Sequence, residues 1–139
     1  MILRESDSTI YTKGSTKAQE EGTIDTEHIV RAATEAAIDM KATELTIIDV
    51  RERTSLCDWF VLCNGSNSRQ IQAIADHILR LFKKDLEIQP VGVEGKSSKK
   101  WVLIDLGDVI VHVFDQNMRG YYDLDGLWID APRVQPAEL

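Results

Sequence analysis

The chain has 139 residues, of which 43% are hydrophobic and 28% charged, a balance typical of one globular domain with short tails. Its 23 acidic and 16 basic residues give a net charge of −7, so we expect no direct binding of free nucleic acid, which needs clustered cations. No apolar run approaches the ~20 residues of a membrane span, and two cysteines form neither a zinc nor a disulfide pattern, which predicts a cytoplasmic protein without metal or cofactor.

The two ends of the chain differ from its middle. Residues 1–25 hold seven apolar residues without a helical or strand period, which predicts a flexible N-terminal extension. A docked segment around residues 2–10 is the alternative. We expect the folded domain to span residues 26–130 and a loose C-terminal tail to span residues 131–139.

Hydrophobic periodicity in the middle of the chain alternates between helix and strand. The predicted elements, in chain order, are a helix from Asp25 or Thr26 to Met40, strands over 45–50 and 59–63, a helix over 71–82, strands over 88–93, 101–106 and 109–114, and a short helix or turns over 119–128. Gly107-Asp108 between the last two strands is a typical two-residue hairpin turn. The predicted fold is therefore an α/β domain, a mixed β-sheet with helices packed against it.

The Gly65-Ser66 pair could bind a phosphate, because it follows a strand and precedes a helix, where backbone N–H groups and the helix dipole favour anions. Nucleotidyltransferases use a Gly-Ser pair at such a junction, with paired carboxylates on the following strand to hold metal ions. The predicted strand over 88–93 contains no acid, and Asp49 and Asp58 do not stand two apart on one strand. An ordinary helix N-cap is the simpler interpretation of Ser66. A nucleotidyltransferase-like enzyme that binds nucleotides stays the alternative function.

Other catalytic constellations are not visible. His28, His77 and His112 are scattered, and His112 alternates with apolar strand residues as a core or interface histidine does. Cys57 and Cys63 fit partly buried small residues without a catalytic role. We therefore expect a protein that is not an enzyme.

A protein-binding surface is better supported. Residues 101–130 contain six acids and one base, Arg119, which is −5 of the net charge of −7. Strand alternation puts Trp101, Leu103 and Asp105 on one face, opposite an all-aliphatic face. An exposed tryptophan beside carboxylates is typical of a binding hot spot. The alternative is a second layer of structure that covers Trp101.

A basic cluster, Lys96, Lys99 and Lys100, directly precedes this strand. Such a cluster is more often a solvated loop, although it could contact a phosphate.

Five segments carry a resemblance to a known family: Asp49–Arg51, Asp58–Gln70, Gly92–Gly95, Trp101–Phe114 and Arg119–Trp128. In this order they resemble the iojap family, known in bacteria as the ribosomal silencing factors. The resemblance covers about residues 26–129. One departure is the Lys99-Lys100 pair, where acidic or small residues are common in the family.

The resemblance implies a fold related to nucleotidyltransferases but without their catalytic acids, and a role without catalysis. It implies binding to the large ribosomal subunit through the subunit's fourteenth protein, which would block joining of the small subunit and repress translation. A role in large-subunit maturation and a homodimer in the free state are also implied. The predicted partner-binding residues are Trp101, Leu103, Asp105, Asp108 and Glu94.

Overall fold

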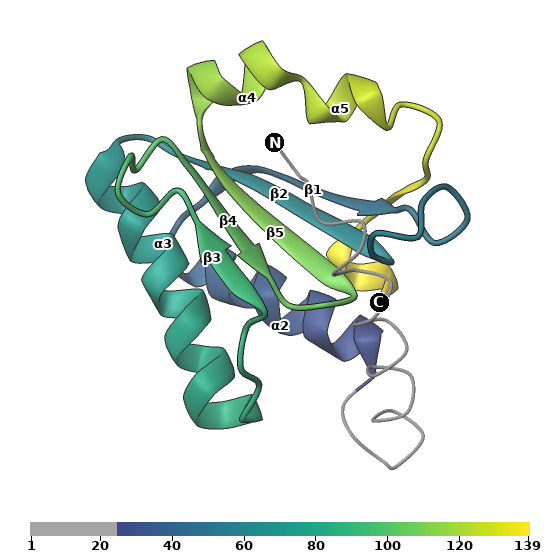
Figure 1. The fold of residues 1–139 in the computed structure, drawn as a ribbon, viewed down its shortest axis with the longest axis horizontal. Coiled ribbons are helices and arrows are strands. Elements are labelled where there is room, and N and C mark those ends of the chain that lie inside the picture. Colours follow the sequence, from purple (N-terminus) through teal and green to yellow (C-terminus); the bar gives the residue numbers. More distant parts are fainter. Residues whose placement is uncertain (1–24) are drawn as a thin grey trace.

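A computed structural model describes residues 25–139, and the predicted N-terminal extension lies outside this range except for Asp25. The described chain forms a six-stranded mixed sheet with helices on both faces, which confirms the predicted fold class (Figure 1). The helices are α2 (Thr26–Asp39), α3 (Ser68–Leu81), α4 (Gln116–Tyr122) and α5 (Leu124–Leu127), with a π-turn at Phe82–Leu86 and a 3-10 turn at Pro136–Glu138. The strands are β1 (Thr43–Asp49), β2 (Trp59–Gly65), β3 (Gly92–Glu94), β4 (Trp101–Asp105), β5 (Val109–Asp115) and β6 (Arg133–Val134).

Side-chain caps determine where the two long helices begin. The carboxylate of Asp25 accepts a hydrogen bond from the His28 backbone N–H at 2.9 Å, so Asp25 caps α2. The amide oxygen of Asn67 does the same for α3 through the Gln70 N–H, also at 2.9 Å. Beyond Leu81 the helix widens into the π-turn and stops at Glu87, whose φ of 54° is left-handed.

The strand order is β3-β4-β5-β2-β1-β6, with β2 and β5 parallel at the centre and every other pair antiparallel. The β4–β5 hairpin turns at Gly107-Asp108, as predicted, and Gly107 has the positive φ of 97° that favours glycine. The chain leaves β2 for α3 on one face of the sheet and leaves β5 for α4 on the other (Figure 1). The connections that follow the two parallel strands therefore lead to opposite faces of the sheet.

Each face of the sheet contributes its own apolar core. Val102, Ile104 and the alternating valines of β5 pack with α2 and α3. The opposite side chains of the same strands, Leu103 and Phe114 among them, pack with α4, α5 and the loop that follows. The sheet is thus the middle of three layers, and successive side chains along a central strand alternate between the two cores.

Two sequence predictions need correction. The strand expected over 88–93 is only Gly92–Glu94, because Pro90 has no N–H for a sheet ladder, and the observed strand ends in an acid. The C-terminal tail is not loose: Val134 pairs with Ile47 on β1, and Arg133 donates to the Asp125 carbonyl oxygen at 2.7 Å. No helix within residues 25–139 is long and apolar enough to span a membrane.

Candidate protein-binding face

Trp101 begins β4 and is half-buried in a cluster of aromatic rings. Its indole Nε1 donates a hydrogen bond to His112 Nδ1 at 2.9 Å. Its ring stacks on Phe114 at 5.1 Å between centroids and lies 4.6 Å from the ring of Tyr122 on α4. The predicted alternative, a second layer over this face of the sheet, is therefore what the structure shows, and it leaves part of Trp101 accessible.

His112 is fully buried beneath Trp101. Burial lowers the pKa of His112 to about 3, and the positive charge of Arg119 adds to this effect. The neutral ring can therefore accept the indole hydrogen bond at Nδ1 and carries its proton on Nε2, which has no partner among the described residues. Of the two predicted positions for His112, core or interface, the structure shows the core, and His112 fixes the orientation of the tryptophan.

The other predicted binding residues differ from Trp101 in exposure. Leu103 is 5% exposed and belongs to the core under α4 and α5, so its predicted surface position is wrong. Asp105 is also buried, and its carboxylate accepts the Gly107 N–H at 2.8 Å. Glu94 is exposed and pairs with Leu103 across β3 and β4, close to Trp101.

Asp108 lies in the hairpin turn, at the opposite end of β4 from Trp101, so the structure does not bring these two residues together. Its side chain is 7% exposed, and its backbone oxygen accepts the N–H groups of Asp58 and Trp59 at 2.7 and 3.0 Å. Burial raises the pKa of Asp108 to about 6, and the negative charge of Asp58 adds to the shift. These contacts indicate that Asp108 stabilises the turn rather than contributing to a surface shared with Trp101.

The acidic excess of residues 101–130 is mostly engaged in internal contacts. Asp115 caps α4 through the Asn117 N–H, and Asp123 caps α5 through the Gly126 N–H, each at 3.0 Å. Asp123 and Asp130 remain exposed. The predicted acidic surface is therefore much smaller than the residue count indicates.

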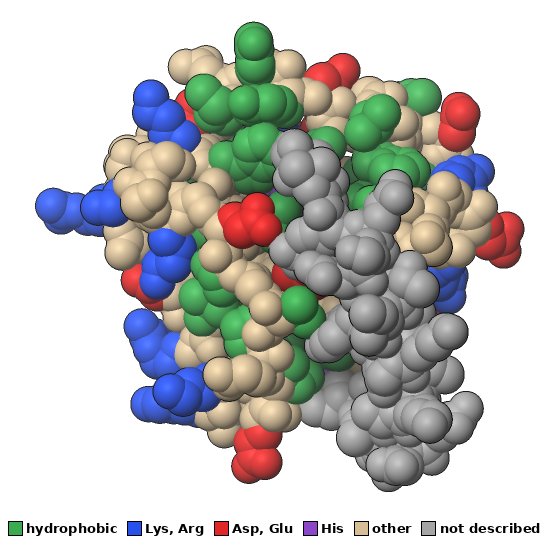
Figure 2. Space-filling model, in the orientation of Figure 1, with side chains coloured by type: hydrophobic (Ala, Val, Ile, Leu, Met, Phe, Trp, Pro, Cys, Tyr) green, Lys and Arg blue, Asp and Glu red, His purple; other side chains and the backbone are tan. Residues whose placement is uncertain are grey.

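Instead, exposed apolar side chains gather on the outer layer. They are Tyr121 (79% exposed), Tyr122 (46%), Leu127 (66%) and Ile129 (70%), and together with Trp101 we call them the α4–α5 face. Figure 2 shows hydrophobic side chains over these two helices. The sequence prediction missed this face because it expected a short helix or turns over residues 119–128 that close one end of the domain and assigned them no exposed apolar face. The sequence signal that could have revealed it is the set of apolar residues in this segment that no predicted core helix or strand needed.

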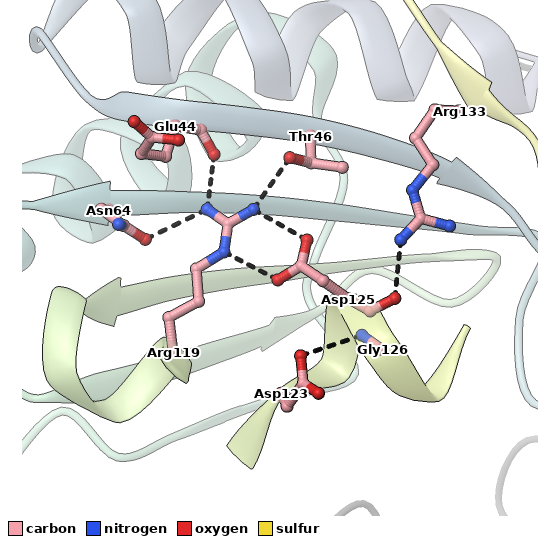
Figure 3. Close-up of polar contacts among 8 residues, drawn as sticks. All are labelled: Glu44, Thr46, Asn64, Arg119, Asp123, Asp125, Gly126 and Arg133. Atoms are coloured by element: carbon pink, nitrogen blue, oxygen red, sulfur yellow. Dashed lines mark hydrogen bonds and ion pairs between the residues drawn. The ribbon is translucent and has the colours of Figure 1, made fainter. Parts of the chain in front are cut away.

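Arg119 holds the outer layer against the sheet (Figure 3). Its Nε and Nη2 donate to the two carboxylate oxygens of Asp125, both at 3.0 Å. The remaining donors reach Asn64 Oδ1 at 3.1 Å, Thr46 Oγ1 at 2.8 Å and the backbone oxygen of Glu44. The hydrogen bonds from Arg119 to Asp125 lower the pKa of the Asp125 carboxyl group. All five guanidinium N–H groups are thus used within the chain.

A cleft of about 800 Å³ lies beside Arg119, at the carboxyl ends of β2 and β5. Open α/β sheets bind ligands at such a point, where neighbouring parallel strands lead to opposite faces. Here the cleft is lined by polar side chains such as Thr43 and Gln116, and the guanidinium is turned to internal partners. Among the described residues, the lining of this cleft offers no cation to an anionic ligand, because Arg119 is used internally.

The Gly65-Ser66 junction is likewise engaged internally. A Cβ on Gly65 would lie 2.7 Å from Ile71 Cγ1 and 3.0 Å from the Ile71 nitrogen, so helix packing requires glycine. The backbone N–H and hydroxyl group of Ser66 both donate to Gln70 Oε1, at 2.6 and 2.8 Å. Within residues 25–139 no group of three His, Cys, Asp or Glu side chains could hold a metal ion. The N-cap of α3 is Asn67 and not Ser66, and the Ser66 donors are used by Gln70, so the contacts favour a helix-capping turn over phosphate binding.

Known proteins resemble this chain over nearly all of its described length. The family model described as "Ribosomal silencing factor during starvation" matches residues 23–139. The chain is 38% identical to the ribosomal silencing factor of Halalkalibacterium halodurans over 78% of this chain and 92% of that protein. It is 39% identical to the ribosomal silencing factor of Bacillus subtilis, over 75% and 87% of the two chains. A crystal structure of a Chromobacterium violaceum protein matches with a TM-score of 0.73 and 35% identity, over 76% of this chain and 87% of that one.

Proposed function

The chain belongs to the ribosomal silencing factor family, and we propose that it represses translation by binding the large ribosomal subunit and blocking its association with the small subunit. Family membership over residues 23–139 is the observation that carries this proposal. The partner on the subunit is its fourteenth protein. Repression follows from steric overlap, which requires binding at the joining surface and no catalysis.

The α4–α5 face supplies the contact. Tyr121, Leu127 and Ile129 are exposed, and binding would remove their apolar area from water, which stabilises the complex. Trp101 adds a ring whose orientation the His112 hydrogen bond already fixes, so less rotamer entropy is lost on binding. The exposed carboxylates of Asp123 and Asp130 at this layer favour a partner with basic residues at the rim of its site.

In this proposal the free protein is a cytoplasmic homodimer. The homodimer is what the family resemblance implies. Sedimentation of the free protein and of its complex with large subunits measures the number of copies in each state directly.

The primary experiment is co-sedimentation of the purified protein with large subunits, small subunits and assembled ribosomes. We expect binding to large subunits alone, together with fewer assembled ribosomes when small subunits are added afterwards. Equal binding to both subunits, or binding without loss of assembly, contradicts the proposal. A role in maturation alone would instead give precursor ribosomal RNA in cells lacking the protein and normal assembly of mature subunits.

Variants localise the contact. Truncation of a central interface residue costs about 2–4 kcal/mol, which weakens binding about 30- to 1,000-fold. We expect this loss for Trp101→Ala and for Tyr121→Ala, and the second variant should keep the melting temperature because Tyr121 is 79% exposed. Ile38→Ala is the matched control, since Ile38 is 50% exposed on α2, beyond the opposite face of the sheet. Normal subunit binding by both test variants would exclude the α4–α5 face.

The nucleotidyltransferase-like alternative is tested separately. A ligand that binds the native state raises the melting temperature. We expect no rise with nucleoside triphosphates and magnesium, because Gln70 occupies the Ser66 donors. A rise that the Ser66→Ala variant abolishes would restore the alternative.

A further inference from the structure

Positive charge is concentrated in one segment of this acidic protein. Residues 66–100 contain seven basic and four acidic residues, a net charge of +3, whereas the rest of the chain has a net charge of −10. This segment comprises α3, the π-turn and β3 with the loop that follows it. The charge separation therefore coincides with one structural region.

The basic side chains share a surface, which we call the α3 flank. Its members are Arg69, Arg80, Lys83 and Lys84 on α3 and the π-turn, and Lys96, Lys99 and Lys100 in the β3–β4 loop. All seven are exposed, and the helical members lie opposite the buried isoleucine stripe of α3. Figure 2 shows Lys and Arg side chains along the edge of the molecule where Figure 1 places α3.

One ion pair brings the loop against the helix. Lys96 Nζ lies 3.0 Å from Asp76 Oδ1, and Asp76 is the acid on the exposed stripe of α3. Beside this pair a groove of about 450 Å³ is lined by Ser68, Arg69 and Lys99. Within the described chain the flank cations other than Lys96 make no ion pair, so their charge is available to a partner.

We propose that the α3 flank binds the phosphate backbone of ribosomal RNA when the protein is on the large subunit. This inference rests on the proposed function and adds a second contact to the α4–α5 face. From Arg69 to Lys84 the stripe extends about 20 Å along the helix, long enough to follow several phosphates. Solvated lysines and arginines on flexible stems suit such a contact, which needs charge rather than a shaped pocket.

The overall charge of −7 determines when the flank acts. Free RNA meets an acidic protein and is not attracted at long range. Once the α4–α5 face has docked, the flank binds at high effective concentration, so a weak phosphate contact still strengthens the complex. The inference thus agrees with the expectation that free nucleic acid is not bound.

The test compares two partners, whole large subunits and the isolated fourteenth protein. The variant is the triple substitution Arg80→Ala, Lys83→Ala and Lys84→Ala, whose side chains are all exposed, so the fold should persist. Each phosphate contact contributes about −0.7 to −0.9 to the slope of log affinity against log salt. We expect the triple variant to bind whole subunits about 10- to 100-fold more weakly at low salt, with a slope reduced by about 2. Its affinity for the isolated protein should be unchanged.

A tethered probe tests proximity to RNA directly. Cys57 and Cys63 are the two cysteines of the chain and both are buried, so a cysteine introduced by Lys84→Cys can be labelled selectively with an iron chelate that generates hydroxyl radicals. We expect cleavage of ribosomal RNA in the subunit complex. Glu52→Cys is the control, because Glu52 is exposed on the β1–β2 loop, away from α3 in Figure 1.

The outcomes separate the two proposals. If the wild-type protein does not bind large subunits, the proposed function fails. If it binds but the triple variant has the same affinity and salt slope, the flank is a solvated surface and this inference fails. An equal loss of affinity for the isolated protein would mean that the flank contacts protein rather than RNA, and it also overturns the inference.

Discussion

Removal of the Arg119 guanidinium should detach the outer helical layer from the sheet. Arg119 joins α4 to α5 through Asp125, and to β1 and β2 through Thr46 and Asn64. The side chain of Arg119 is 11% exposed and that of Asp125 is 34% exposed. The Arg119→Ala variant therefore loses a bidentate ion pair and leaves several polar atoms without their partner.

The magnitude follows from these exposures. Breaking a fully buried pair costs about 3–5 kcal/mol, and solvent screening at the partly exposed Asp125 reduces this to about 2. The bonds to the other oxygens add about 1–2 kcal/mol in total. A loss of about 3–4 kcal/mol lowers the melting temperature of a domain of this size by roughly 12–16 °C. Arg119→Lys should recover less than half, because lysine cannot form the two parallel bonds.

Acid sensitivity provides a second readout. Arg119 lowers the pKa of the Asp125 carboxyl group in the folded state. The stability from this pair is therefore present above the ordinary carboxyl pKa and is lost as pH falls through the lowered one. The difference in unfolding free energy between wild type and Arg119→Ala should be largest near neutral pH and should shrink below about pH 4.

Thermal unfolding monitored by circular dichroism from pH 3 to 8 measures both effects. Arg80→Ala is the matched control, because Arg80 is exposed on α3 and should change stability by less than about 0.5 kcal/mol. If Arg119→Ala melts within about 2 °C of wild type, or if its deficit persists unchanged at pH 3, Arg119 does not hold the outer layer.

Two further predictions concern stability, measured by denaturant unfolding. Gly65→Ala should destabilise the fold by about 1–3 kcal/mol, because the new Cβ would clash with Ile71. Gly120→Ala has no atom within 4 Å of its new Cβ and should stabilise α4 by up to about 1 kcal/mol. Equal effects of the two substitutions would refute the packing argument. Because the pKa of Asp108 is raised to about 6, wild-type stability should fall as pH rises from about 4 to 6, and Asp108→Asn should remove this fall and be about 1 kcal/mol more stable at pH 7. A variant as pH-dependent as wild type would contradict the assignment.

Local patterns in the sequence predicted the long elements well, because their signals are contained within a few turns. The cap Asp25, the isoleucine stripe of α3 and the Gly107-Asp108 turn all act over short separations, and the N-cap of α3 lies at Asn67, one residue after the expected Ser66. Strand parity also grouped Trp101 with Leu103 correctly. Parity states which side chains share a face, however, and does not state whether another layer covers that face.

The errors involve long-range contacts. Leu103 is buried by α4 and α5, more than ten residues further along the chain, and the tail is ordered because Arg133 and Val134 reach the edge of β1. Counting acids overestimated surface charge because capping and ion pairing depend on positions that a count ignores. Arg119 gave no local signal, since its partners lie at residues 44–64 and at 125.

The same contacts explain how an α/β sheet of this kind can present a protein-binding face. The crevice at the carboxyl ends of parallel strands is where such sheets usually receive a ligand. Here Arg119 lines this crevice and bonds to the chain itself, so a polar group that could bind a ligand instead fixes α4 to β1 and β2. Gln70 on α3 likewise bonds to the chain and fixes α3 to the end of α2. Because Tyr121 and Tyr122 lie two and three residues after Arg119 on α4, rigidity at the crevice determines the geometry of the α4–α5 face. If the α4–α5 face binds the subunit as proposed, substitutions at Arg119 should therefore weaken that binding even though its guanidinium bonds to groups within the chain.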